Sequence, residues 1–278
     1  MIRTMVTATN TMGQLQKQLD LISNNIANSS TTGYKESTAT FSSMLAQEAQ
    51  NQRGDSANRL TPPGLRLGNG AKIAQTQLVS AQGSLQRTDR PLDFAFNNEN
   101  LFFKVLVQDA EGGQKQNFTR NGAFYFTPVN DQEVMLVDGQ GNAILNQNNE
   151  TIVLDGPVDD IRHVGNGRIA MNANGTEQQV ELGVVNIQRP QLMERVSSIY
   201  FGIPENAEEL GIDPAEAVVQ MEGGLRLNVG LEQGALEQSN VDLSKSFTDL
   251  IQVQRNYQFQ SRAISISDQM SGLVNGMR

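Results

Sequence analysis

Residues 1–28 read MIRTMVTATNTMGQLQKQLDLISNNIAN, and the spacing of their apolar side chains decides the fold. These side chains recur alternately four and three positions apart, at Met1, Met5, Ala8, Met12, Leu15, Leu19, Ile22 and Ile26. The alternation is that of a heptad seam along one face of an α-helix. Because such a helix is stabilised mainly by burying its apolar face, the seam predicts a partner.

A second helical pattern occupies residues 240–278, at the other end of the sequence. No proline interrupts this stretch, and Ser239 followed by Asp242 resembles a capping box, with Ser239 as the cap. One apolar stripe contains Leu243, Phe247, Leu250, Tyr257 and Ile264. A second contains Phe259, Ala263, Ile266, Met270, Leu273 and Met277. We therefore expect the two terminal helices to pair, as in a coiled-coil stalk.

The chain between the helices divides in two. Residues 36–75 contain Pro62-Pro63-Gly64 and many polar residues, which predicts an extended arm or linker. Beyond them, short apolar runs alternate with Asn-Gly and Asp-Gly turn dipeptides, which predicts a mostly antiparallel β domain. The clearest expected hairpin joins residues 117–120 to 123–126 through Asn121-Gly122. The predicted fold is α+β, with four segments: helix 1–35, arm 36–75, β domain 76–230 and helix 231–278.

Composition excludes several classes of function. The 278 residues carry a net charge of −9, and such an acidic surface repels phosphates, so we expect no nucleic-acid partner. Structural disulfides and cysteine metal sites are excluded because the chain has no cysteine. The first residues lack the apolar core of a secretory signal, and no run of residues reaches the ~20 apolar residues of a membrane span.

Candidate catalytic groups are few. His163 is the only histidine, so a Ser-His-Asp triad would depend on it alone. The adjacent acidic pairs are more typical of solvated turns than of metal sites: Asp159-Asp160 and Glu208-Glu209. The glycine triplets at 68–70, 139–141 and 165–167 lack the strand-to-helix context of a phosphate loop and predict turns. We predict no enzyme activity, cofactor, metal or small-molecule substrate.

Four sets of residues resemble the flagellar rod and hook proteins, in the order in which that family has them. They are ISNNIAN at 22–28 with TGYK at 32–35; GSLQRT at 83–88 with PLDFAF at 91–96 and FF at 102–103; FTRNGAF at 118–124; and SNVDL at 239–243 with QRNY at 254–257. The resemblance covers both ends and the middle of the chain. In size and in having a single β domain, the chain is most similar to the distal-rod proteins and their Gram-positive paralogues.

This resemblance implies a structural subunit of the flagellar basal body, outside the cytoplasm, exported without a cleaved signal peptide. Its partners would be copies of itself, other rod and hook proteins and the flagellar type III export apparatus. It would transmit torque and form the wall of the export channel. The implied assembly interface comprises Met5, Met12, Leu15, Leu19, Ile22, Asn24, Asn25, Ile26 and Asn28 on the first helix, and Leu243, Phe247, Leu250, Tyr257 and Ile264 on the last. Phe41 followed by Leu45 is similar to the short export signal of this class.

Alternative interpretations remain for most of these features. The asparagines at 24, 25 and 28 could simply end a helix, because Asn side chains bond to nearby backbone groups. The heptad seam could belong to an ordinary core helix. The whole chain could be a soluble binding module whose β domain holds a ligand and whose helices dimerise, or a glycosidase with two suitably spaced carboxylates. Loss of the terminal helices would leave a binding module or an enzyme active, but would abolish the assembly of an axial subunit.

Overall fold

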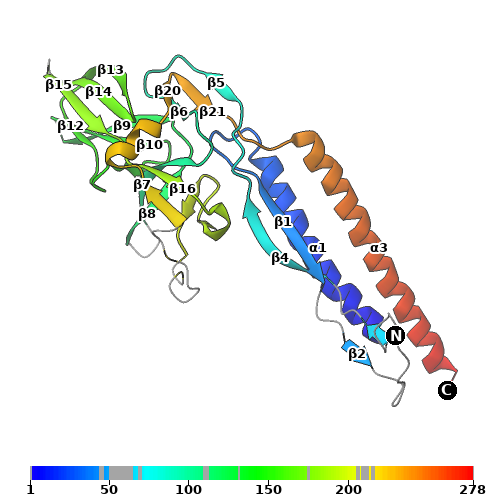
Figure 1. Ribbon diagram of the computed structural model, residues 1–278. Coiled ribbons are helices and arrows are strands. Elements are labelled where there is room, and N and C mark those ends of the chain that lie inside the picture. The colour runs from blue at the N-terminus through cyan, green and yellow to red at the C-terminus, as the bar shows by residue number, and fades with distance from the viewer. Residues whose placement is uncertain are drawn as a thin grey trace. The chain divides into compact units, whose positions relative to one another are not determined.

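The computed structural model of the protein consists of two compact units (Figure 1). Unit 1 contains Met1–Ile26, Ser37–Gln77 and Asp242–Arg278, and unit 2 contains Ala27–Glu36 and Leu78–Val241. The structure describes residues 2–43, 47–49, 65–67, 71–108, 113–130, 132–173, 176–204, 207, 213 and 217–277. No helix within these ranges is long and apolar enough to cross a membrane. The prediction of two terminal helices and a central, mostly antiparallel β domain is confirmed.

Unit 1 is built from the two terminal helices and short paired strands. Helix α1 spans Ile2–Ala27 and helix α3 spans Leu243–Gly276. In the range expected to form an extended arm, strands pair into two small sheets. One sheet joins β1 (Ser37–Ser43) to β4 (Ala71–Leu78), and the other joins β2 (Gln47–Ala49) to β3 (Leu65–Leu67).

Helix α1 ends at Ala27, just before Asn28. The amide of Thr31 donates to the carbonyl of Asn28, and Gly33 adopts the left-handed conformation, with φ +71°. Asn25 is buried near the end of the helix, where its side-chain amide exchanges two hydrogen bonds with the backbone of Ser37: Nδ2 donates to the carbonyl at 2.9 Å, and Oδ1 accepts from the amide at 3.1 Å. The Asn-rich stretch therefore holds the first residue of β1 against the last turn of α1.

The sequence predicts Ser239 as the N-cap of helix α3, but the structure shows that the N-cap is Asp242. The side chain of Asp242 accepts a hydrogen bond from the amide of Lys245 at 3.0 Å, which satisfies one of the free amides of the first turn. Ser239 lies before the helix, where its hydroxyl accepts from the amide of Val241. The range 231–278, expected to be helical, thus begins with two strands, β20 (Leu231–Gln233) and β21 (Ala235–Glu237).

Unit 2 is organised around a large antiparallel sheet. Its strands follow the order β12-β10-β11-β7-β8-β18-β17, while β9 also pairs with β10, and β16 pairs with both β7 and β19. Their bounds are β7 Leu101–Gln108, β8 Gln114–Thr119, β9 Phe124–Asn130, β10 Glu133–Asp138, β11 Ala143–Ile144, β12 Val153–Asp155, β16 Val184–Ile187, β17 Glu194–Arg195, β18 Tyr200–Gly202 and β19 Val218–Gln220. The 3-10 helices are η1 (Pro190–Leu192) and η2 (Gly223–Asn228).

Smaller sheets complete the unit. Strands β13 (Val158–Gly165), β14 (Arg168–Ala173) and β15 (Thr176–Glu181) form an antiparallel meander. The turn between β13 and β14 uses positive φ at three successive residues, Gly165, Asn166 and Gly167, as the glycine triplet predicted. Strand β20 pairs with β6 (Phe94–Phe96), and β21 pairs with β5 (Leu85–Arg87).

The prediction of a hairpin at Asn121-Gly122 is wrong. Strand β8 pairs with β7 and β18, whereas β9 pairs with β10, and neither Asn121 nor Gly122 has positive φ. The segment between β8 and β9 instead packs against the backbone of Phe94, whose amide donates to the carbonyl of Gly122 at 3.0 Å. Glycine is required here because a Cβ at position 122 would lie 1.8 Å from the carbonyl oxygen of Phe94.

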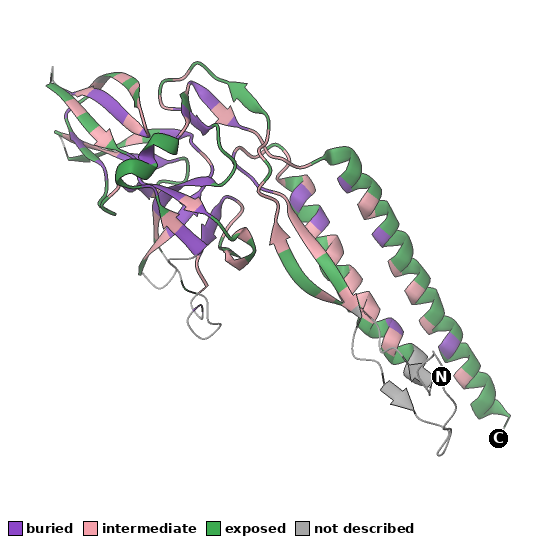
Figure 2. Cartoon of the chain, viewed as in Figure 1, coloured by how far each residue is buried: buried purple, intermediate pink, exposed green. Residues whose placement is uncertain are grey.

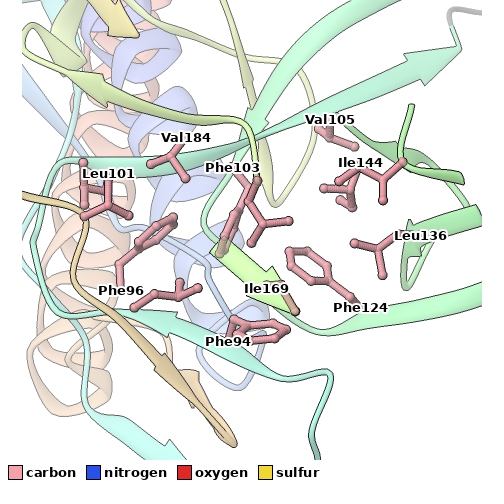
Figure 3. Packing of buried hydrophobic residues seen from close by; sticks show 14 of the residues in the cluster. Phe94, Phe96, Leu101, Phe103, Val105, Phe124, Leu136, Ile144, Ile169 and Val184 are labelled. Carbon is pink, nitrogen blue, oxygen red and sulfur yellow. The ribbon is translucent and has the colours of Figure 1, made fainter. Parts of the chain in front are cut away.

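The main core lies between the large sheet and the smaller sheets, and aromatic rings fill its centre (Figure 3). The ring of Phe103 contacts that of Phe96 at 4.2 Å and that of Phe124 at 5.0 Å between centroids, and Phe94 lies 5.9 Å from Phe124. Figure 2 shows that buried residues concentrate in unit 2, whereas α3 is mostly exposed. The hydrophobic core therefore lies in the β domain, whereas α3 leaves most of its side chains exposed.

Substitution of Gly122 by Ala should destabilise unit 2 by at least about 1–3 kcal/mol, because the new methyl group overlaps a backbone oxygen that cannot move aside. Gly113→Ala is the matched control, since its Cβ would meet nothing within 4 Å. Chemical unfolding of the two purified variants measures the difference. Equal midpoints for both would contradict the close packing of this segment.

Candidate functional site

Four side chains of unit 2, which we call the junction cluster, join segments from both ends and from the middle of the chain: Lys35, Arg120, Glu237 and Asn240. The carboxylate of Glu237 lies between two cations. Its Oε1 is 2.6 Å from Nζ of Lys35, and its Oε2 is 2.5 Å from Nε of Arg120. All three charged side chains are at most 2 % exposed. A buried charge is tolerated only when it is paired and hydrogen-bonded, so these three groups depend on one another.

Backbone groups satisfy much of the remaining hydrogen-bonding capacity of the cluster. Nζ of Lys35 donates to the carbonyl of Ala81 at 2.8 Å, and Nη1 of Arg120 donates to the carbonyl of Leu101. The amide of Gly83 donates to Oε1 of Glu237 at 3.0 Å. The cluster thus reaches the chain just before β5 and at the start of β7.

Asn240 connects three passages of the chain through one amide group. Its Oδ1 accepts from the amide of Glu36 at 2.6 Å, and its Nδ2 donates to the carbonyls of Val79 and Ala81, both at 2.9 Å. The amide of Val79 also donates to the carbonyl of Glu36 at 2.9 Å. Because an Asn side chain offers both a donor and an acceptor, it bridges these backbones as a charged residue could not.

Arg195, on strand β17, holds the same region. Its guanidinium donates to the carbonyl of Lys35 at 2.5 Å and to that of Ser198 at 2.8 Å. It also lies over two aromatic rings, 4.5 Å from the centroid of Tyr34 and 5.1 Å from that of Phe201. Cation–π contacts of this kind are strengthened by desolvation, and Tyr34 is buried.

Burial governs the electrostatics of the cluster. Desolvation lowers the pKa of the Lys35 ammonium and of the Arg120 guanidinium, and the carboxylate of Glu237 opposes this by raising both pKa values. The charged state of the cations is therefore supported chiefly by one carboxylate. Without Glu237, both cations would lose their ion-pair partner, and Arg120 would remain next to the rings of Phe96 and Phe102.

Two glycines let the segments approach closely enough for this cluster to form. A Cβ at Gly83 would lie 2.0 Å from the carbonyl oxygen of Gln238, and one at Gly33 would lie 2.4 Å from the amide nitrogen of Asn121. The amide of Gly33 donates to the carbonyl of Glu237 at 2.8 Å. Backbone thus packs on backbone at both positions, which only glycine permits.

The residues that carry the family resemblance converge at this cluster. Lys35 belongs to TGYK, Gly83 to GSLQRT, Arg120 to FTRNGAF and Asn240 to SNVDL. Sequence reasoning identified each motif but did not group these charges, and it missed Glu237 entirely.

Helix α1 has two adjacent rows of covered positions. The apolar row contains Ala8, Met12, Leu15, Leu19, Ile22 and Ile26. The second row is mainly polar, and we call it the polar row: Thr7, Thr11, Gln14, Gln18, Leu21 and Asn25, with Asn28 following just beyond the end of the helix. The polar row faces the strands of unit 1, because Gln14 accepts from the amide of Ile73 and Asn25 bonds to Ser37. Of the other residues expected in the interface, Met5 and Asn24 are exposed.

Helix α3 carries one covered row and one exposed row. The covered row, or inner seam, recurs at alternating intervals of four and three: Ser246, Leu250, Val253, Tyr257, Gln260, Ile264, Ser267 and Ser271. The predicted residues Leu250, Tyr257 and Ile264 lie in this seam, whereas Leu243 and Phe247 are exposed. The outer seam is exposed throughout: Phe259, Ala263, Ile266, Met270, Leu273 and Met277. The exposed fractions of Phe259 and Leu273 reach 71 % and 70 %.

The remaining candidate residues have a plain structural setting. Phe41 lies on β1 and is 40 % exposed, while Leu45, Glu208 and Glu209 lie outside the described residues. The backbone amide of His163 donates to the side chain of Gln233, and burial lowers the pKa of its imidazole. The described residues contain no group of three or more His, Cys, Asp or Glu that could hold a metal ion.

Removal of the charge at Glu237 should cost about 3–5 kcal/mol of unfolding free energy, because Glu237→Gln leaves two buried cations without their ion-pair partner. Asp160→Asn makes the same chemical change in the exposed pair that Asp160 forms with Arg162, and should cost less than about 1 kcal/mol. Urea unfolding of both variants decides the matter. Similar losses for the two would mean that the cluster contributes little.

Comparisons with known proteins agree with the motifs. A family model described as flagella basal body rod protein matches residues 5–35, and one described as flagellar basal body rod FlgEFG protein C-terminal matches residues 232–277. Over the full length of both chains, the sequence is 41 % identical to the flagellar hook-basal body complex protein FlhP of Bacillus subtilis. It is 31 % identical to the flagellar basal-body rod protein FlgG of Borreliella burgdorferi, covering 100 % of this chain and 99 % of the relative.

FlgG of B. subtilis is 30 % identical, with 99 % of each chain covered. These relatives are structural proteins, which confirms the prediction that the chain is not an enzyme. The chain belongs to the flagellar basal-body rod proteins and is a structural subunit of the FlgG and FlhP type.

Proposed function

We propose that the protein is an axial subunit that stacks helically in the flagellar rod, through its terminal helices, to transmit torque and to wall the export channel. The observation that carries this proposal is the outer seam of α3. Six positions of one helix face, among them Phe259, Ile266 and Leu273, are exposed in the single chain. A continuous exposed apolar face on a water-soluble chain marks an interaction surface.

The inner seam supports pairing of α1 with α3 as a coiled coil. Both helices belong to unit 1, and the covered positions of both follow the alternation of four and three that such pairing requires. On this proposal the apolar row of α1 packs against the inner seam of α3. The outer seam then remains available for neighbouring subunits.

Contacts between copies would be heterologous, because the outer seam of one subunit packs on a different surface of the next. Contacts of that kind that do not close produce an open helical array. Such an array would leave an axial channel, and torsional load would pass from copy to copy through the packed helices. The further partners are the other rod and hook proteins, together with the type III export apparatus that delivers the chain; Phe41 and Leu45 remain the candidates for the export signal.

The rival proposal, a soluble binding module, has less support. A cavity of about 240 Å³ in the described part of unit 2 is lined by Asn98, Asn186, Leu225 and other polar and aliphatic residues, and Glu99 is the charged side chain in its lining. Small-molecule sites usually combine a deep apolar pocket with a few precisely placed polar groups. The exposed helix face, by contrast, is extended and apolar, as an assembly surface requires.

Introduction of a charge into the outer seam should block assembly and leave the fold intact. Met270→Glu places a carboxylate on this seam, while Gln269→Glu adds the same charge at the neighbouring exposed position outside it. We expect Met270→Glu to abolish motility in a complemented deletion strain and to reduce incorporation into basal bodies at least tenfold. The control should behave as the unmodified protein does.

Both variants should unfold at the same urea concentration, which separates loss of assembly from loss of folding. Normal incorporation of Met270→Glu would exclude the outer seam as an assembly surface.

Pairing of the two helices can be tested by disulfide trapping, since the chain has no native cysteine. Leu19→Cys should form a disulfide with a cysteine at one of the inner-seam positions 250, 257 or 264 in assembled material. A cysteine at Gln258, which is exposed, serves as the control partner. Trapping at position 258 alone, or at none of the four positions, would rule out the proposed pairing.

A further inference from the structure

The last strands of unit 2 are supplied by the segment just before helix α3. Strand β20 pairs with β6, and strand β21 pairs with β5. Leu231, on β20, is buried in the main core together with Phe94 and Phe96. Beyond β21, the amide of Gln238 donates to the carbonyl of Ser84 at 2.9 Å. Unit 2 is therefore completed by residues far along the chain from most of its sheet.

The same segment brings the counter-charge of the junction cluster. Each ion pair described for Lys35 and Arg120 is made with Glu237. Asn240, three residues later, bonds to Glu36, Val79 and Ala81. Before this segment arrives, the two cations lack the carboxylate that forms their ion pairs, and the passages at Glu36 and at Val79 to Ala81 lack the amide that joins them. Burial of unpaired cations is strongly unfavourable, so the cluster cannot close without residues 237–240.

We infer that residues 231–241 act as a closing segment, without which unit 2 does not reach its folded state. In a chain delivered amino terminus first, unit 2 then stays open until almost all of unit 2 has emerged. This use of the closing segment rests on the proposed function, which includes export, whereas closure itself is a property of the fold. The segment precedes α3 directly, so closure of unit 2 and release of the last helix follow one another.

Closure late in the chain has a physical consequence for export. Because α3 begins at Leu243, directly after the closing segment, unit 2 closes only when α3 is the one element still to emerge. Because Glu237 comes late in the sequence, the dependence of the junction cluster on Glu237 delays the closure of unit 2. The edges of β5 and β6 stay unpaired until their partner strands, β21 and β20, have emerged.

The experiment is a force profile of the nascent chain. The full sequence is translated with an arrest peptide placed at successive lengths, and release of arrest reports the tension produced by folding outside the ribosome. We expect no major release at lengths that expose residues only up to 230, and a peak once residue 241 has emerged. Glu237→Gln should reduce that peak at least twofold, and Glu232→Gln, at an exposed position on β20, should leave it unchanged.

A peak of full height before residue 231 emerges would overturn the inference, as would a peak that Glu237→Gln leaves intact. If Glu237→Gln abolishes folding altogether, the unmodified chain still decides by the length at which its peak appears. Neither result bears on the outer seam, because incorporation of Met270→Glu into basal bodies is measured in cells. Failure of closure and failure of the proposed function are thus separable.

Discussion

The carboxylate of Glu237 between Lys35 and Arg120 is the interaction on which the organisation of unit 2 depends. A lone ion pair in a protein interior adds little net stability, because desolvation offsets most of its attraction. The ion pairs matter because other arrangements of the same cations are much less stable. Any arrangement that buries Lys35 and Arg120 without Glu237 is disfavoured by several kcal/mol, so the pair selects one way of bringing the chain segments together. The same principle allows a buried polar group to set register in other folds.

The need for such selection follows from the path of the chain. It passes between the two units at 26–27, 36–37, 77–78 and 241–242. Polar backbone near these passages must find partners inside unit 2, because a buried amide or carbonyl left unpaired is costly. Asn240 and the glycines at 33 and 83 meet that need, the first by bonding and the others by permitting close approach. Together they hold residues 33–36 and 237–240 in one part of unit 2.

Sequence reasoning recovered what depends on local pattern. The apolar row of α1 and the triplet at Gly165 were predictable because helix periodicity and positive φ leave direct marks in the residues. The hairpin at Asn121-Gly122 was not, because Asn-Gly there serves close packing against Phe94 and not a two-residue turn. Nor was the partner of Arg120, since Glu237 is 117 residues away and no local pattern joins them. Local signals specify elements, while long-range pairing of charges becomes visible only in three dimensions.

Helix α3 depends more on its surroundings than its length suggests. Its inner seam contains three serines and a glutamine among Leu250, Val253, Tyr257 and Ile264, so the area it can bury there is small. Burial stabilises by about 25 cal/mol per Å², whereas ordering each residue costs about 1–2 kcal/mol. The larger apolar side chains lie on the outer seam, where water covers them in the single chain. The burial that would stabilise this helix most is therefore placed where only another molecule can supply it, so order in α3 and association through α3 are thermodynamically linked.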